Sequence, residues 1–299
     1  MSKTAIVFGG QGSQYKNMGE KFLCMEIAKP IYKNIKEYHK IIKDDDILTL
    51  SMTENLQPIM LAFQLAALEI IKSRMEVHAT CGLSLGEYSS LVTSKVLNVE
   101  EALNLVKHRA RLMANEAKKI DSAMLVVFNK SESELKSLLT SENLNEKVFI
   151  SNINSPRQVV LAGEKSSINK MKNIFKNLSI KNISLEVSGA FHTNYMKNAA
   201  KKYTEYLEDV KFNRPKCKYY LNLTGQEYND ENFVDLLSKH ITSPVRLFSC
   251  ISNMINDKVT KVVEIGPGSV ISNIIKKYFK EIEVISLKNE DEIIEFGRR

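Results

Sequence analysis

A serine between two glycines is the clearest candidate for covalent chemistry in this sequence. The segment Gly82-Leu83-Ser84-Leu85-Gly86 fits the pattern G-x-S-x-G and lies between a strand-like run and a helical run. Such a turn raises a serine hydroxyl on a sharply bent backbone, where side chains two residues away on either side would crowd it. The pattern also occurs as an ordinary turn serine, but its place between a strand and a helix favours a nucleophile.

A serine hydroxyl needs a base, and the chain offers five histidines. Three of them are expected on the surface or at the start of a strand: His39, His78 and His108. His192 follows Ser188-Gly189-Ala190-Phe191, a glycine-marked loop after a predicted strand, where functional groups tend to lie. Position alone favours His192 only slightly over His240 as the base.

One arginine occupies a special position on the helix predicted from Val99 to Ala117. The apolar residues of this helix, at positions 99, 102, 103, 106, 110, 113 and 117, form a single stripe. At about 100° per residue, Arg109 lies at the edge of the stripe, whereas Arg111 points away from it. A guanidinium is always charged and can grip a carboxylate through two hydrogen bonds. We therefore expect Arg109 to reach a semi-buried site and Arg111 to be exposed.

Strands and helices alternate around these residues. Residues 4–8 form a continuous apolar run that ends in a glycine-rich turn, as a buried strand would. Residues 56–71 have helical spacing, and residues 262–266 and 270–278 read as a strand followed by a helix. This alternation predicts an α/β fold with a mostly parallel sheet. The G-x-S-x-G turn between a strand and a helix makes the expected large subdomain hydrolase-like.

Residues 123–187 follow a different order: strand, helix, strand, strand, helix, strand. Ser131 and Glu134 form a capping box at the start of the first of these helices. The βαββαβ order is that of a ferredoxin-like unit. We therefore expect a ferredoxin-like small subdomain at 123–187, inserted into a large α/β subdomain formed by 1–122 and 188–299.

Composition excludes several classes of protein. The 299 residues are 43% hydrophobic and 26% charged, which argues against disorder and coiled coil. No apolar run approaches the roughly 18 to 20 residues that span a bilayer, and no signal peptide is recognised, so a cytoplasmic protein without membrane association is expected. The four cysteines are far apart and form no C-x-x-C pair, which predicts reduced thiols. The net charge of +7 suits an acidic partner or anionic substrate, but scattered lysines and the absence of tryptophan argue against nucleic-acid binding.

Taken together, the motifs resemble those of the malonyl-CoA:acyl carrier protein transacylases and the related acyltransferases of polyketide synthases. The matching segments follow the order of that family and span almost the whole chain. They are FGGQGSQ (Phe8 to Gln14), LQP (Leu56 to Pro58), GLSLGEYSSL (Gly82 to Leu91), HRARLM (His108 to Met113), NINSPRQVVLAG (Asn152 to Gly163), SGAFH (Ser188 to His192), SPVR (Ser243 to Arg246) and EIGPGSVIS (Glu264 to Ser272).

The resemblance implies roles for the reacting groups. Ser84 would take the acyl group from a thioester, and His192 would act as general base and then as general acid for the leaving thiol. In the family a main-chain carbonyl orients the imidazole, from a position that is usually glutamine and here is His240. The oxyanion hole would consist of the backbone N–H groups of Gln11 and Leu85.

The resemblance also implies residues that select the substrate. Arg109 matches the arginine that holds the free carboxylate of malonyl groups. Phe191 is typical of malonyl-selective members, whereas Leu83 stands where most members have histidine and Gly9 where proline is common. Three further polar residues match ones that line or brace the site, although each could equally be a turn or capping residue: Asn154, Gln57 and Asn222.

The function implied is a ping-pong acyl transfer. Malonyl-CoA would acylate Ser84, and the phosphopantetheine thiol of an acidic acyl carrier protein would collect the malonyl group, with no metal or redox cofactor and with a monomeric enzyme. Two alternatives remain: an editing acyl hydrolase, which would have no use for the Arg109 grip, and a non-catalytic scaffold that binds carrier proteins. Fatty-acid and polyketide synthesis use the same chemistry, so both pathways stay open.

Overall fold

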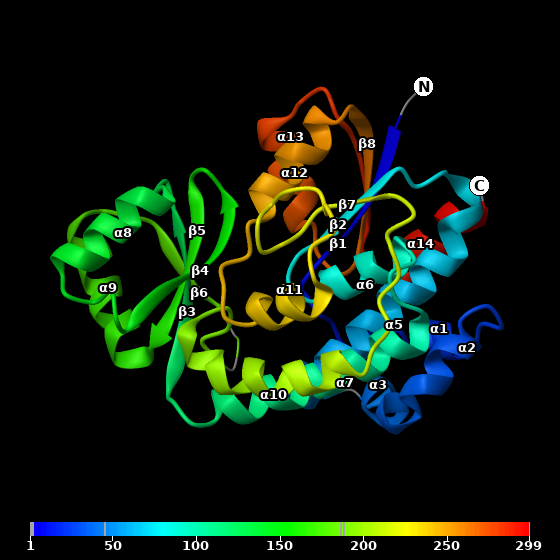
Figure 1. The fold of residues 1–299 in the computed structure, drawn as a ribbon, viewed down its shortest axis with the longest axis horizontal. Coiled ribbons are helices and arrows are strands. Elements are labelled where there is room, and N and C mark those ends of the chain that lie inside the picture. The colour runs from blue at the N-terminus through cyan, green and yellow to red at the C-terminus, as the bar shows by residue number, and fades with distance from the viewer. Residues whose placement is uncertain (1–2, 45, 186, 188, 299) are drawn as a thin grey trace.

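The structure is a computed structural model that describes residues 3–44, 46–185, 187 and 189–298. Two separate sheets dominate it (Figure 1). Sheet A has the strand order β7-β2-β1-β8-β9 and is parallel throughout, with β1 (Lys3–Phe8), β2 (Ala79–Gly82), β7 (Lys218–Tyr219), β8 (Val259–Ile265) and β9 (Glu283–Leu287). Sheet B has the order β4-β5-β3-β6 and is antiparallel, with β3 (Ser122–Phe128), β4 (Val148–Ser155), β5 (Gln158–Glu164) and β6 (Asn182–Leu185).

Helices cover both sheets. Those before sheet B are α1 (Glu20–Leu23), α2 (Lys29–Tyr32), η1 (Lys33–Tyr38), α3 (His39–Lys43), α4 (Ile47–Ser51), α5 (Thr53–Ile71), η2 (Lys72–Arg74), α6 (Gly86–Thr93) and α7 (Val99–Ala117), where η marks a 3-10 helix. Those within and after sheet B are α8 (Glu132–Ser141), α9 (Lys165–Asn177), η3 (Asn194–Met196), α10 (Lys197–Glu208), α11 (Phe233–His240), α12 (Leu247–Asn256), α13 (Val270–Tyr278) and α14 (Glu290–Arg298). Figure 1 shows α12 and α13 on one side of sheet A and α5 and α6 on the other.

The central strand β1 is buried on both faces. Ile6 and Phe8 belong to the core that α5, α6 and α7 share, whereas Ala5 and Val7 belong to the core beneath α12 and α13. All four side chains are fully buried. A strand covered on both sides has no polar face, which explains its continuous apolar run and confirms the predicted parallel sheet.

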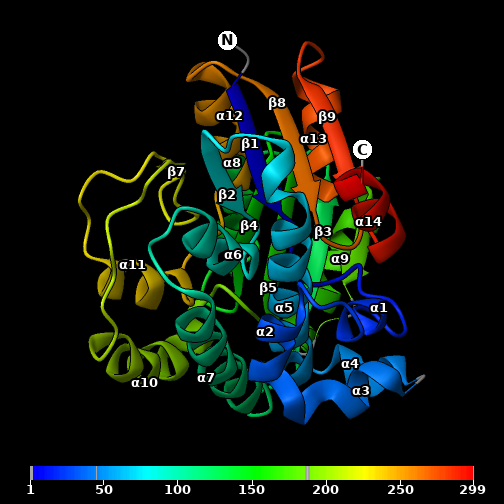
Figure 2. The same cartoon turned by 90° about the vertical axis from the view of Figure 1, so that its right-hand side faces the viewer.

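Helix α5 is the longest apolar segment. Together with η2 it spans Thr53–Arg74, 22 residues, and its most apolar 18-residue window has a mean hydropathy of 1.2, so by length and composition it could cross a membrane. However, 78% of its most apolar window is buried inside the protein, and Figure 2 shows α5 running along sheet A. It packs there as a core helix.

Sheet B has the ferredoxin-like strand order predicted from the sequence. Its strands alternate with α8 and α9, and the capping box of Ser131 and Glu134 starts α8. Leu161 and its neighbours pack beneath α8 and α9, whereas Val160 faces the other way, toward the large sheet's helices. The predicted fold class is confirmed. Residues 1, 188 and 299, which bound the predicted large subdomain, lie outside the described residues, as does the first residue of SGAFH.

Candidate active site

Strand β2 and helix α6 hold Ser84 on the sharp turn that the G-x-S-x-G pattern predicts. The φ angle of Ser84 is 53°, in the left-handed region. A Cβ atom at Gly82 would lie 2.0 Å from the carbonyl carbon of Gly86, and one at Gly86 would lie 2.4 Å from the carbonyl oxygen of Phe8. Both glycines are therefore required by close backbone contact, as expected from the sequence.

Ser84 and His192 form a hydrogen-bonded pair. The Oγ atom of Ser84 lies 2.7 Å from Nε2 of His192, and Nδ1 of His192 lies 2.8 Å from the carbonyl oxygen of His240. The carbonyl can only accept, so Nδ1 carries the proton and Nε2 is free to take one from the serine. Burial, with the nearby His240 and Arg109, holds the pKa of His192 well below its usual range. The imidazole is therefore neutral at neutral pH, as a general base must be.

Asn222 braces the turn that carries Ser84. The N–H of Ser84 donates to Oδ1 of Asn222 at 2.9 Å, and Nδ2 of Asn222 donates to the carbonyl of Gly82 at 2.6 Å. Asn222 is fully buried, so both bonds are shielded from water. Asn222, which was expected to line or brace the site, thus holds the turn that carries Ser84.

Helix α7 carries Arg109 into the interior. Its side chain is fully buried, deeper than the semi-buried position expected, while Arg111 is exposed. Nη1 of Arg109 donates to Oε1 of Gln57 at 2.7 Å, and Nη2 lies 3.5 Å from Oγ of Ser84. The guanidinium also lies over the ring of Tyr88, 5.5 Å from its centre. A buried cation thus lies beside the serine hydroxyl, with no carboxylate among its recorded contacts in the described residues.

The glycine-rich loop after β1 lies against the turn that carries Ser84. Gly10 comes so close to Leu83 that a Cβ atom would lie 2.8 Å from the Leu83 carbonyl oxygen. In the described part of the chain, the backbone N–H groups of Gln11 and Leu85 have no backbone partner. The side chain of Gln11 accepts from Nε2 of Gln57 at 3.0 Å, which links this loop to the Arg109 contact. Leu85 directly follows Ser84, and Gln11 and Ser84 line the same cavity.

A cavity of about 320 Å³ opens over Ser84 and His192. Its apolar wall comes largely from sheet B and the chain that follows it: Met124, Val126, Phe128, Val160, Ile183, Leu185 and Val187. Leu83 and Phe191 also line it, and so does Asn154, whose buried Oδ1 atom has no hydrogen-bond partner among the described residues. The cavity therefore joins a reactive centre made by one sheet to a wall made by the other.

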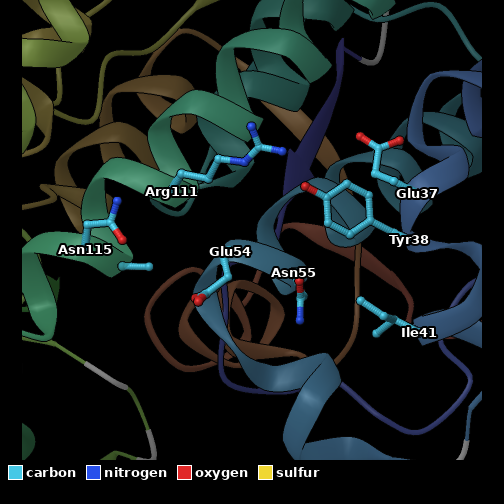
Figure 3. Close-up of a pocket in the computed structure, with 8 residues that line it drawn as sticks. Glu37, Tyr38, Ile41, Glu54, Asn55, Arg111 and Asn115 are labelled. Atoms are coloured by element: carbon cyan, nitrogen blue, oxygen red, sulfur yellow. The ribbon is translucent and has the colours of Figure 1, made fainter.

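Another cavity, of about 400 Å³, lies between η1, α5 and α7 (Figure 3). Arg111 extends into it from α7 toward Tyr38. None of the sequence-predicted site residues lines this cavity, and it has no serine, cysteine or histidine in its lining. Within the described residues no cluster of three or more histidine, cysteine or acidic side chains could hold a metal ion. The candidate active site is therefore the cavity over Ser84.

Every sequence-predicted site residue lines this cavity or adjoins one that does. The lining residues are Ser84, His192, Gln11, Leu83, Phe191 and Asn154, and the adjoining ones are Leu85, Arg109, Gln57, Asn222 and His240. Glu87, in the first turn of α6, was not predicted to belong to the site, but its carboxylate accepts from the N–H of Asn222 at 2.9 Å and from the hydroxyl of Tyr219 at 2.8 Å. Its position directly after Gly86 was the only indication in the sequence that it lies near the site.

Comparison with known proteins gives a uniform result. Residues 5–292 match the family described as the acyl transferase domain. The malonyl CoA-acyl carrier protein transacylase of Staphylococcus aureus (strain MRSA252) is 32% identical over 98% of both chains, and that of Bacillus subtilis (strain 168) is 31% identical over 98% of this chain and 96% of its own. The crystal structure of the transacylase from Clostridium perfringens superposes with a TM-score of 0.90, at 29% identity over 98% of this chain and 96% of that one. A malonyl-transacylase solved in complex with a type II PKS acyl-carrier protein gives a TM-score of 0.90 at 26% identity over 99% of both chains.

Proposed function

Because the chain belongs to the acyl transferase family, we propose that it transfers a malonyl group from malonyl-CoA to the phosphopantetheine thiol of an acyl carrier protein, in fatty-acid or polyketide synthesis. The observation that carries this proposal is the fully buried Arg109 guanidinium, 3.5 Å from the hydroxyl of Ser84. A buried cation beside a nucleophile favours an acyl group that ends in a carboxylate.

Acylation begins with the Ser84–His192 pair. As Oγ of Ser84 attacks the thioester carbonyl carbon, its proton moves to Nε2 of His192, 2.7 Å away. The same proton then passes to the CoA sulfur as the carbon–sulfur bond breaks, which leaves a malonyl-Ser84 ester and neutral His192. The carrier-protein thiol repeats these steps in reverse: it gives its proton to His192, attacks the ester and releases Ser84.

The negative charge of each tetrahedral intermediate falls on the former carbonyl oxygen. We assign its stabilisation to the backbone N–H groups of Gln11 and Leu85, which donate to no backbone carbonyl in the described part of the chain. One such donor contributes about 3 kcal/mol to transition-state stabilisation. The close approach of Gly10 to Leu83 supports this assignment, because it brings the loop that carries Gln11 against the turn that carries Ser84.

Substrate selection uses charge first and shape second. Arg109 can bind the malonyl carboxylate through two hydrogen bonds, because Gln57 occupies only Nη1, the contact of Nη2 with Ser84 is long at 3.5 Å, and Nε has no partner among the described residues. Phe191 and Leu83 line the cavity and restrict a branch at the second carbon of the acyl group. Steric selection of this kind amounts to about 1 to 3 kcal/mol, less than a buried ion pair can supply.

The remaining features follow from this chemistry. The proton and acyl transfers balance without a metal or redox cofactor, so we propose that none is needed. The net charge of +7 favours encounter with an acidic carrier protein. We further propose a cytoplasmic monomer in which residues 1–122 and 188–299 form the large subdomain and 123–187 the small one.

Intact-protein mass spectrometry tests the proposal. The protein is mixed with malonyl-, methylmalonyl- or acetyl-CoA, and holo acyl carrier protein is then added. We expect a malonyl adduct that disappears as the carrier protein gains the same mass. Faster release of acetate or longer acyl groups to water would instead identify a hydrolase, and carrier binding without an adduct would identify a scaffold.

A further inference from the structure

The side chain of His240, and not only its carbonyl group, lies at the reactive centre. It is 1% exposed, and its Nδ1 atom lies 2.7 Å from Oε2 of Glu87, whose side chain is 4% exposed. Its ring centre lies 4.9 Å from that of His192. No step of the proposed reaction uses either the Glu87 carboxyl or the His240 imidazole, so this buried contact needs a separate explanation.

Glu87 is surrounded by groups that favour its ionised form. Its Oε1 atom accepts from the hydroxyl of Tyr219 and from the N–H of Asn222, and its Oε2 atom faces His240. Burial by itself would raise the pKa of the Glu87 carboxyl, but His240 and these hydrogen bonds outweigh burial and hold the pKa below its usual range. A buried carboxylate needs a positive partner to remain stable, and the His240 ring is in contact with it.

We propose that Glu87 and His240 form a buried charged pair whose imidazolium keeps His192 in its neutral, proton-accepting form. The inference rests on the proposed function, because it concerns the base that the function assigns to Ser84. His240 is then a positioning residue in two ways: its carbonyl fixes the orientation of His192, and its side chain fixes the charge of His192.

Two positive charges lie near His192 in this scheme, those of Arg109 and His240, and they differ during the reaction. Among the described residues with recorded contacts, Glu87 from α6 and His192 face the His240 ring, Tyr219 from β7 contacts Glu87, and Arg109 from α7 lies beside Ser84. A malonyl carboxylate would neutralise the charge of Arg109 once it binds. The His240 charge has no contact with the substrate carboxylate in this scheme and persists through the cycle.

This arrangement suits both halves of each transfer. A cation near His192 makes the imidazole a weaker base, but it makes the protonated ring a stronger acid. The ring takes a proton from Ser84 and must then release it to the departing thiolate, so ready release speeds the second half. His240 itself gains and loses no proton in these steps.

The rate of Ser84 acylation as a function of pH tests the inference. Single-turnover acylation by malonyl-CoA is followed by quenched mass spectrometry for the wild type, His240→Gln, Glu87→Gln and the double variant. Removing the imidazolium lets His192 protonate at a higher pH, so the midpoint of the acid limb should rise by about one pH unit in His240→Gln. Glu87→Gln should shift it the same way, since His240 loses the partner of its charge, and the double variant should add nothing further.

His108→Gln serves as the matched control, because His108 lies on the outer side of α7, stacked on Tyr206, and should leave the midpoint in place. The quantity compared between variants is the pH at the midpoint of the acid limb, and not the acylation rate on the plateau. An unchanged or lowered midpoint in His240→Gln would overturn the inference. Loss of rate at every pH without a shift would show a structural role only.

Histidine-labelled NMR of the wild-type protein gives a reading that needs neither variants nor activity. At neutral pH we expect one buried histidine with both ring nitrogens protonated and another that is neutral and protonated at Nδ1. Two neutral buried rings would contradict the inference. Failure of the proposed function would be distinct, since it would appear as the absence of a malonyl adduct on Ser84 whatever the NMR spectrum shows.

Discussion

The two sheets contribute to the active site in different ways. Sheet A and its helices carry Ser84 on the β2–α6 turn, Arg109 on α7 and the carbonyl of His240 on α11. Sheet B contributes mainly apolar wall, such as Val126 and Val160. The reactive half depends on a few hydrogen bonds with fixed geometry, whereas the wall depends on summed apolar contacts that tolerate changes of volume. Substitutions in the two regions should therefore fail in different ways.

The largest effect is expected at the reactive half. Ser84→Ala should reduce malonyl transfer by about 10⁴-fold or more, because no other hydroxyl replaces the nucleophile. Mass spectrometry should find no malonyl adduct, while the thermal unfolding temperature stays near or above that of the wild type. An adduct of unchanged yield on the variant would place the chemistry elsewhere.

A smaller but selective loss is expected at Arg109. Arg109→Ala should lower kcat/KM for malonyl-CoA by about 10²-fold, because the malonyl carboxylate would then be buried without a counter-charge. Acetyl-CoA has no such carboxylate, so its low rate should change little. Arg111→Ala, two residues along the same helix but exposed, is the control. Equal losses with both acyl groups would contradict the carboxylate role.

Two adjacent residues of β5 separate stability from selectivity. Leu161 is fully buried beneath α8 and α9, so Leu161→Ala should lower the free energy of unfolding by about 2 to 5 kcal/mol in urea denaturation. The malonyl preference of the folded fraction should not change. A changed acyl preference would show that the α8 and α9 side of sheet B also shapes the site.

The smallest effect is expected from the neighbouring residue. Val160 lines the cavity, so Val160→Ala should widen it and raise the methylmalonyl-to-malonyl ratio by up to about tenfold. A competition assay with both CoA esters measures this ratio. A lower ratio, or loss of malonyl transfer itself, would contradict the idea that sheet B supplies only the apolar wall while sheet A and its helices supply the reacting groups.

The sequence predicted what depends on local pattern. The helix predicted at residues 99–117 has those bounds, because its apolar stripe and the Asn98 cap both define it locally. The crowding of Gly82 and Gly86 could be predicted because strand, turn and helix are adjacent in the chain. The ferredoxin-like order of sheet B followed from the succession of short strands and helices.

What the sequence did not reveal depends on contacts between distant segments. Helical spacing gave the direction of Arg109 around α7, but its full burial results from packing against Gln57 and Tyr88. The Glu87–His240 contact joins α6 to α11, and neither residue has a local signal for the other. The length of α5 did not stand out in the sequence because Gln57, Gln64 and Glu69 interrupt its apolar residues.

The backbone angle of Ser84 has a consequence for the evolution of the protein. Ser84 and His192 both have left-handed φ angles, 53° and 60°, which cost a residue other than glycine about 1 to 2 kcal/mol each. A folded domain typically has a free energy of unfolding of only about 5 to 15 kcal/mol. The two residues that perform the reaction therefore lower the stability of the protein by a sizeable part of that amount. Selection for durability and selection for turnover therefore act in opposite directions on the same two positions. In an inactive descendant that is no longer selected for turnover, we expect these two positions to be the first to change to residues with lower backbone strain.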